Sequence, residues 1–281
     1  MRQSQIFGRY SMKIKWIVLD MDGTLLDSQK NLPLRFFELK EQLEKLGIKF
    51  ILASGRQYAR MREVVSPLED DFIYISDNGS IVYENRERIL GVTIDDQLSQ
   101  QIIQTSYDKM NVHYVINSLA GAHFLKNIDQ KIETVFNEFY SQRFFVDNFD
   151  DIKDIVKISF YHEDDNFDGS EHLNKYRDQV NITHSGPTWL DVVDKDISKG
   201  IALTTIAKSH NVDLSSVIGF GDAMNDADML AVAGFPIIME NADKRLKDLG
   251  YYETKSNDED GVVLVLEKLV EKNGDGSWLK K

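Results

Sequence analysis

Residues 14–24, IKWIVLDMDGT, determine the fold class of this chain. The first half is apolar and rich in β-branched residues, which is typical of a buried strand, and it stops at a polar turn. Residues two apart in an extended segment point to the same side, so the carboxylates of Asp20 and Asp22 can face one site. A single Asp after a strand is more often a turn or helix-capping residue. Two of them followed by Gly-Thr favour a site.

The same pattern continues on both sides of this segment. A helix pattern over 36–46 closes at Gly47, and an apolar run over 48–53 stops at Ser54-Gly55-Arg56. Strand, helix and strand in this order predict parallel strands with a crossover. The pattern extends to a third strand and turn, and it returns near the C-terminus, at residues 72–75, 80–83, 200–210, 217–220, 236–239, 244–249 and 262–270. We therefore expect an α/β fold with a Rossmann-like parallel sheet.

The middle third of the chain has a different pattern. Helical segments near 98–110, 128–140 and 171–180 alternate with strands near 112–116, 123–125 and 155–161, without a polar turn after each strand. This pattern favours an inserted α+β domain. We expect a core domain of residues 12–83 plus 194–281 and an inserted domain of 84–193, with residues 1–11 being leader residues or an alternative start.

Composition limits the kind of partner. The chain has 281 residues, 42% of them hydrophobic, and a formal charge of −13, with no cysteine. Negative charge repels nucleic-acid phosphates and anionic membranes, and the lack of cysteine rules out disulfides and thiolate sites. We expect a cytoplasmic protein with a small-molecule partner, no nucleic acid, no membrane contact and no obligate protein partner.

Four polar clusters end separate strands or open helices, and in an open parallel sheet such clusters can meet in one crevice. Besides Asp20 and Asp22, they are Ser54-Gly55-Arg56, which would open a helix and suit a phosphate, Lys199, and residues 221–226, GDAMND. Taken alone, Ser54 is an ordinary helix cap and Lys199 an ordinary surface charge. Carboxylate and amide oxygens without Cys or clustered His favour Mg²⁺.

Together and in this order, these clusters resemble the four signature motifs of the haloacid dehalogenase-like (HAD) superfamily of phosphatases. Asn78-Gly79 and residues 239–242 and 256–262 resemble the Cof-type, class IIB branch. The resemblance covers nearly all of the chain after residue 12. It implies a HAD core with an inserted α+β (type II) cap domain.

The resemblance also implies residue roles. Asp20 would be the nucleophile, and Asp22 the general acid and then the general base. Ser54, Gly55 and Lys199 would bind the phosphoryl group, with Gly23 also at the phosphate site. Asp20, the backbone carbonyl of Asp22, and Asp222 would hold Mg²⁺. Asn225 would reach the phosphate or a metal-bound water, and Asp226 would orient Lys199 or the ion.

The implied substrate is a small phosphorylated metabolite. Sugar phosphates come first, although pyridoxal phosphate and flavin mononucleotide fit the same residues. Two other functions stay open: a phosphomutase on the same core, and a catalytically silent metabolite-binding protein.

Overall fold

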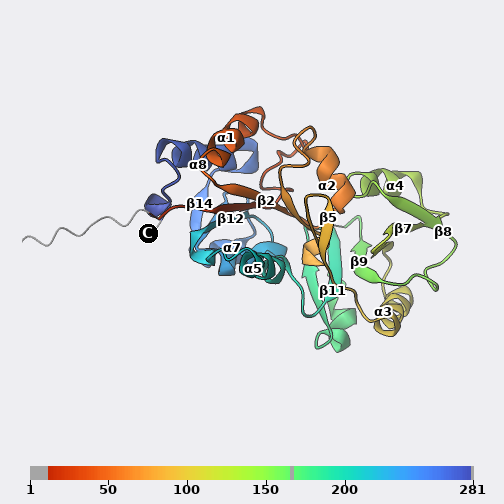
Figure 1. Ribbon diagram of the computed structural model, residues 1–281. Coiled ribbons are helices and arrows are strands. Elements are labelled where there is room, and N and C mark those ends of the chain that lie inside the picture. Colours follow the sequence, from red (N-terminus) through yellow and green to blue (C-terminus); the bar gives the residue numbers. More distant parts are fainter. Residues whose placement is uncertain (1–11, 165–167, 280–281) are drawn as a thin grey trace, which may run out of the picture.

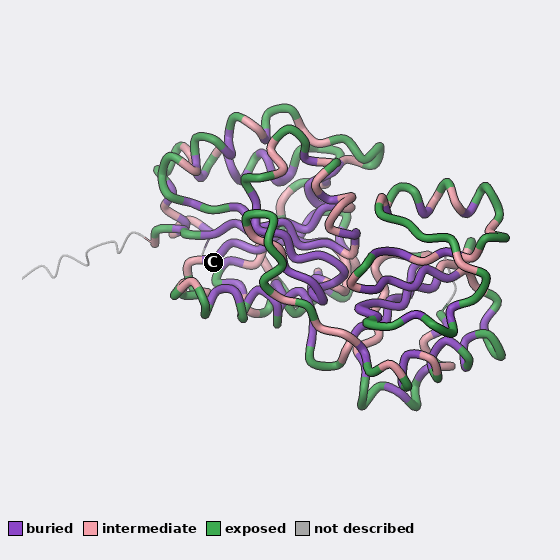
Figure 2. Tube along the Cα trace, turned by 45° about the vertical axis from the view of Figure 1, so that its right-hand side comes forward, coloured by how far each residue is buried: buried purple, intermediate pink, exposed green. Residues whose placement is uncertain are grey.

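The computed structural model describes residues 12–164 and 168–279, and it consists of two lobes (Figure 1). The expected leader, residues 1–11, lies outside the described residues. Each lobe is built on one β-sheet whose central strands are buried, while the outer faces of the helices are exposed (Figure 2). The expected α/β core with an inserted α+β cap domain is confirmed.

The core domain contains an eight-stranded sheet. Its strand order is β14-β13-β12-β1-β2-β3-β4-β5, in which β14 to β3 run parallel and β4 and β5 are added antiparallel. The strands are β1 (Trp16–Leu19), β2 (Lys49–Ala53), β3 (Ile73–Ser76), β4 (Ile81–Glu84), β5 (Glu87–Gly91), β12 (Val217–Gly221), β13 (Phe235–Met239) and β14 (Tyr252–Thr254).

Helices cover both faces of this sheet because its central strands are apolar on both sides. In β1, Ile17 packs in one hydrophobic cluster with residues of α1 and α8, whereas Val18 packs on the other side with residues of α5 and α6. A strand that alternates in this way is buried from both faces, as doubly wound parallel sheets require. The helices of the core are α1 (Leu34–Glu44), α2 (Tyr58–Val64), α5 (Lys199–Ser209), α6 (Ala227–Val232), α7 (Lys244–Lys247) and α8 (Gly261–Glu271).

The cap domain has a six-stranded, mainly antiparallel sheet with the order β10-β11-β9-β6-β7-β8. Its elements are α3 (Asp96–Lys109), β6 (His113–Ser118), β7 (Gly121–Leu125), α4 (Gln130–Asn137), β8 (Arg143–Val146), β9 (Ile155–Tyr161), β10 (Val180–His184) and β11 (Trp189–Asp194). In β9 and β11, Ile158, Leu190 and Val192 pack with α3. The alternate residues Lys157 and Asp191 therefore project from the other face of the sheet.

Strands β8, β10, β11 and β14 were not expected from the sequence, and three further details differ from the sequence-based expectations. The helical segment expected near 171–180 is a shorter 3₁₀ helix (Ser170–Tyr176), and β10 already begins at Val180. Helix α2 begins at Tyr58, after Ser54-Gly55-Arg56, so those residues form a loop instead of the first turn. Strand β5 pairs with β4 in the core sheet, so this sheet extends past residue 83, because a tight turn folds the chain back before it enters the cap.

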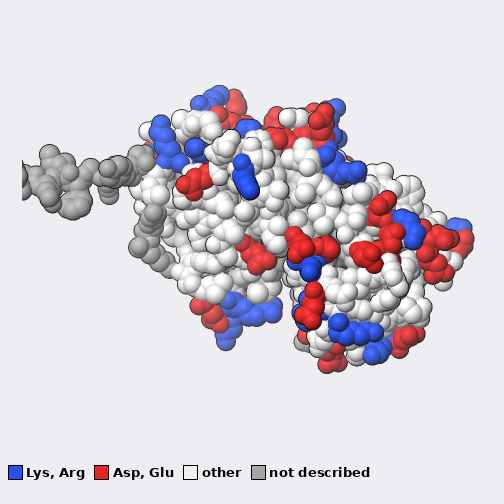
Figure 3. Space-filling view, turned by 60° about the horizontal axis from the view of Figure 1, so that its bottom comes forward, with Lys and Arg blue, Asp and Glu red and all other residues white. Residues whose placement is uncertain are grey.

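The chain contains more acidic residues than basic residues. On the face shown in Figure 3, acidic and basic side chains are interspersed, in a chain with a formal charge of −13. Within residues 12–164 and 168–279, none of the helices combines the length and apolar character that crossing a membrane requires.

Candidate active site

The carboxyl ends of the core strands face the cap domain across a cleft. Asp20 follows β1, Ser54 follows β2, Asn78 follows β3 and Asp222 follows β12. The cleft has an empty volume of about 460 Å³. Of the residues expected from the sequence, Asp20, Asp22, Ser54, Gly55 and Asn225 line it.

Lys199 joins two carboxylates below the cleft. Its Nζ lies 2.6 Å from Oδ1 of Asp20 and 2.7 Å from Oδ1 of Asp226. Lys199 and Asp226 are fully buried. Burial opposes the charge of the ammonium group, but the carboxylates of Asp20 and Asp226 outweigh it and raise the pKa of Lys199. Lys199 is therefore a fixed cation in contact with Asp20.

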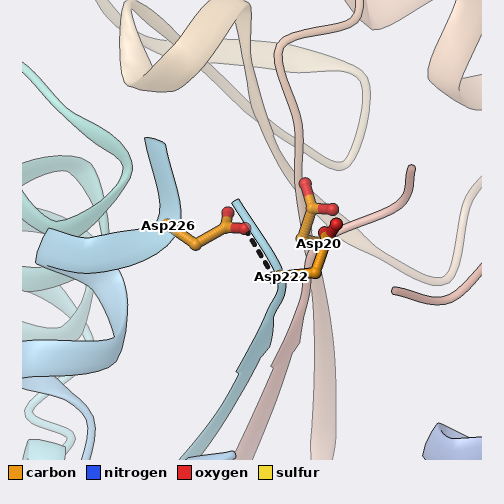
Figure 4. Close-up of side chains that lie close together, drawn as sticks. All are labelled: Asp20, Asp222 and Asp226. Atoms are coloured by element: carbon orange, nitrogen blue, oxygen red, sulfur yellow. Dashed lines mark hydrogen bonds between the residues drawn. The ribbon is translucent and has the colours of Figure 1, made fainter. Parts of the chain in front are cut away.

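Asp20, Asp222 and Asp226 form an acidic cluster (Figure 4). One carboxylate oxygen from each lies within 4.8 Å of the others. Oδ2 of Asp226 accepts hydrogen bonds from the backbone N–H groups of Asp222 and Ala223, at 3.1 Å each. Because its other oxygen accepts from Lys199, Asp226 is held in one orientation. Burial, and then the charge of Asp226, raise the pKa of Asp222 to about 7.

Gly23 supports this cluster by its lack of a side chain. It has a φ of +79°, and a Cβ there would collide with the carboxylate of Asp222. Oδ1 of Asp222 accepts a hydrogen bond from Thr24 Oγ1 at 3.0 Å. Gly23 does not line the cleft. Its structural role is to leave space for the carboxylate of Asp222.

Asp22 is not one of the three carboxylates of this cluster and is held by Arg56. Nε and Nη2 of Arg56 donate to the two oxygens of Asp22 at 2.6 Å each, and Lys30 adds a contact at 2.8 Å. Burial alone would raise the pKa of Asp22, but Arg56 and then Lys30 lower it to about 2. Nη1 of Arg56 also donates to the backbone carbonyl of Glu138 in the cap, at 2.6 Å. Arg56 thus joins core to cap.

The loop after β2 receives a second contact from the cap. Oγ of Ser54 accepts a hydrogen bond from the N–H of Arg56 at 3.1 Å, which fixes the loop. Lys157 is a buried residue of β9. Its Nζ donates to the carbonyl of Gly55 and lies 3.4 Å from Oδ1 of Asp77. The loop expected to bind phosphate is therefore covered by the cap.

Asn225 belongs to a polar network that crosses from core to cap. Its Nδ2 donates to Oδ1 of Asn78 at 3.0 Å and to Ser185 Oγ at 3.3 Å. Nδ2 of Asn78 donates in turn to Oδ2 of Asp191 at 2.6 Å. Ser185 Oγ also donates to this Asp191 oxygen, at 2.6 Å.

Several residues of the cleft carried no role in the sequence-based prediction. Arg56 and Ala223 stood within quoted motifs, and the cap contributes Phe139, Tyr140, Lys157, Ser185, Trp189 and Asp191. A usable signal exists for Lys157 and Asp191, because each is a charged residue inside an otherwise apolar strand. The other cap residues have no local pattern that distinguishes them from packing residues.

The acidic cluster fits a divalent cation. Asp20, Asp222 and Asp226 bring three carboxylates together against the single ammonium group of Lys199. All the ligand atoms on offer are hard oxygens, which suit Mg²⁺. Since both oxygens of Asp226 already accept hydrogen bonds, Asp20 and Asp222 are the carboxylates best placed to bind an ion.

Comparisons with known proteins agree with this arrangement. Residues 17–266 match the profile of the haloacid dehalogenase-like hydrolase family. The chain is 28% identical to the 5-amino-6-(5-phospho-D-ribitylamino)uracil phosphatase YbjI of Escherichia coli, over 92% of this chain and 97% of that protein.

Solved structures share the fold. SMU.1108c of Streptococcus mutans superposes with a TM-score of 0.85 at 25% identity, covering 92% of this chain and 99% of its own. The sugar phosphatase BT4131, of HAD subclass IIB, superposes with a TM-score of 0.78 at 21% identity, covering 91% and 98%. The chain therefore belongs to the haloacid dehalogenase-like hydrolases and has the fold of their class IIB phosphatases.

Proposed function

We propose that the protein is a Mg²⁺-dependent phosphatase that hydrolyses small phosphomonoesters, sugar phosphates above all, through an aspartyl-phosphate intermediate. The contact of Lys199 with both Asp20 and Asp226, beside Asp222 and below the cleft, carries this proposal. It combines a carboxylate nucleophile, a fixed cation and a set of oxygen ligands at one point.

Asp20 is the nucleophile in this proposal. It lines the cleft, and Lys199 holds its Oδ1, so its position is fixed before the ester arrives. Its carboxylate attacks phosphorus, the bond from phosphorus to the alcohol oxygen breaks, and the phosphoryl group is transferred to Asp20. Water then attacks phosphorus, which releases inorganic phosphate and restores the carboxylate.

Asp22 is the proton donor to the leaving alcohol and the base for the attacking water. In the free chain it is a carboxylate held by Arg56 and Lys30, with its pKa lowered to about 2. The acid role therefore requires the bound ester to draw Arg56 away from Asp22. A phosphate group suits this exchange, because a guanidinium binds phosphate as well as carboxylate through paired hydrogen bonds.

Ser54, the N–H of Gly55 and Lys199 are the donors that we assign to the phosphoryl oxygens. Asn225 presents its amide oxygen as an acceptor, since its Nδ2 already donates to Asn78 and Ser185. An acceptor does not suit a phosphate anion, so we assign Asn225 to a metal-bound water or a substrate hydroxyl.

Asp20, the backbone carbonyl of Asp22, and Asp222 would hold Mg²⁺. When bound, the ion would neutralise charge on the phosphoryl oxygens and on the nucleophile. Asp226 would act through Lys199 and through the backbone N–H groups that fix Asp222.

The preference for sugar phosphates rests on the printed names of two similar proteins. YbjI is named for a phosphorylated ribityl compound, and BT4131 is named as a sugar phosphatase.

The test measures free phosphate and isomeric products from a panel of phosphomonoesters, with Mg²⁺ and with a chelator. Wild type should release phosphate only with Mg²⁺, and Asp20→Asn should lose about 10⁴-fold or more in kcat while staying folded. Turnover of Asp20→Asn within tenfold of wild type would refute the nucleophile assignment. Isomer formation in place of free phosphate would identify a phosphomutase.

A further inference from the structure

The cleft contains two buried acceptor atoms that have no partner among the described residues. They are Oδ1 of Asp191, in cap strand β11, and Oδ1 of Asn225, in the core. The side chain of Asp191 is 3% exposed. A buried polar atom without a hydrogen bond is destabilising, so such atoms inside a cleft indicate where a ligand donates.

The other oxygen of Asp191 accepts two hydrogen bonds. Oδ2 accepts from Nδ2 of Asn78 and from Oγ of Ser185, at 2.6 Å each. Both contacts come from protein groups, and together they fix the plane of the carboxylate. The position of Oδ1 is therefore set before a substrate binds. Asp191 is thus a preorganised acceptor.

The same contacts determine which end of the Asn225 amide is free. A carboxylate only accepts, so the group that Asn78 presents to Asp191 must be its NH₂, and Oδ1 of Asn78 then faces Asn225. Asn225 must therefore donate its own NH₂ to this oxygen of Asn78, which leaves Oδ1 of Asn225 without a partner. Two acceptors, one from each domain, thereby face a ligand that carries donors.

The buried cation Lys157 also lines the cleft and interacts electrostatically with Asp191, but it makes no hydrogen bond to Oδ1 of Asp191. Nζ of Lys157 instead donates to the carbonyl of Gly55, lies 3.4 Å from Oδ1 of Asp77 and lies 5.4 Å from the centre of the Tyr140 ring. The required donor at Asp191 therefore comes from the ligand. Trp189, two residues before Asp191 on the same face of β11, adds an apolar surface to the cleft.

We propose that Asp191 determines ester specificity: its Oδ1 accepts a hydrogen bond from a hydroxyl group of the leaving alcohol, so that the cleft selects phosphate esters of sugars and polyols. This inference rests on the proposed phosphatase function and assigns its leaving-group site. Asn225 Oδ1 accepts from a second hydroxyl or from a water of the same site. Asp191 binds substrate and takes no part in the transfer of the phosphoryl group.

The experiment compares ribitol 5-phosphate with n-pentyl phosphate, which share chain length and phosphate and differ in the hydroxyl groups. Wild type should prefer ribitol 5-phosphate by at least about 10- to 100-fold in kcat/KM, as expected for a hydrogen bond to a charged group. Equal kcat/KM for both esters would overturn the proposal without any variant.

Asp191→Asn is the variant that isolates the free oxygen. Its amide oxygen can still accept from Asn78 and Ser185, while its NH₂ replaces the acceptor Oδ1. The ratio of kcat/KM for the two esters should fall at least tenfold, mainly through KM for ribitol 5-phosphate. Asp194→Asn, the same change on the same strand outside the cleft, should keep the wild-type ratio. A uniform loss on both esters in Asp191→Asn would overturn the proposal.

A binding measurement separates this inference from the phosphatase function. In an Asp20→Asn background, calorimetric binding of ribitol 5-phosphate should weaken at least tenfold when Asp191→Asn is added, with a smaller effect on n-pentyl phosphate. Absence of phosphate release by wild type would refute the proposed function alone. Unchanged binding of ribitol 5-phosphate on adding Asp191→Asn would refute the role of Asp191 alone.

Discussion

Arg56 holds both carboxylate oxygens of Asp22, with Nε–Oδ2 and Nη2–Oδ1 distances of 2.6 Å, and its third nitrogen donates to the Glu138 carbonyl of the cap. The guanidinium is 1% exposed and lies 5.1 Å from the centre of the Phe139 ring. One side chain therefore contacts both the proposed proton donor and the cap. Its release from Asp22 and the binding of substrate are expected to be linked.

Arg56→Ala should lower kcat/KM by roughly 10²-fold, because the variant loses the paired, charge-assisted hydrogen bonds that Arg56 is proposed to make to the phosphate group of the ester. Steady-state kinetics on a sugar phosphate measures this. Arg60→Ala is the matched control, since Nε of Arg60 donates to the same Glu138 carbonyl, at 3.1 Å, and Arg60 has no contact with Asp22. An equal loss in both variants would mean that the cap contact matters and the Asp22 contact does not.

Asp22→Asn should lower kcat on an alkyl phosphate by about 10²–10⁴-fold, the usual contribution of a general acid or base. With p-nitrophenyl phosphate the leaving group needs no proton, so transfer to Asp20 should stay fast while hydrolysis of the phosphoryl enzyme becomes slow. Stopped-flow measurements should then show a burst of p-nitrophenolate equal to the enzyme concentration. Equal losses on both esters, without a burst, would contradict the dual role of Asp22.

Mg²⁺ should stabilise the wild-type protein by about 2–3 kcal/mol at a hundredfold excess over its Kd, because it binds the folded acidic cluster and not the unfolded chain. Thermal unfolding with and without Mg²⁺ measures this independently of activity. Asp222→Asn should lose most of the shift in Tm. The exposed Asp228→Asn, on α6, should retain it. An undiminished shift in Asp222→Asn would place the ion elsewhere.

Acid should destabilise the cap domain through His123. Burial lowers the pKa of His123, whose Nδ1 lies 3.1 Å from the Ile116 carbonyl and whose ring stacks on Phe144. Since the folded pKa lies below the unfolded value of about 6.5, the unfolded chain binds the proton more readily, and stability is complete above that pH and falls below it. The decrease in Tm between pH 7.5 and pH 5.5 should be smaller in His123→Gln. A decrease equal to that of wild type would show that His123 does not contribute.

Local sequence patterns predicted most helices and strands of the core but fewer of those in the cap. The run that ends at Asp20 is buried from both faces, and such runs alternate with helical segments, so the parallel pairing of the strands and the polar turns at their ends followed from the sequence. The helical segment expected over 171–180 is a shorter 3₁₀ helix, because the buried residues Leu173 and Tyr176, three residues apart, suit the three-residue period of a 3₁₀ helix. The loop at Ser54 was interpreted as a helix start because capping residues also occur in loops.

The sequence by itself determined the fold class, the discontinuous core and the family, since strand periodicity and short motifs are local properties of the chain. Only the tertiary structure decided that Arg56 pairs with Asp22, and that Asp191 contacts Asn78, 113 residues away along the chain. Such contacts depend on how the cap sheet lies over the core. A charged residue in an apolar strand indicates that it has a buried partner, but the identity of that partner is fixed only when two distant segments meet.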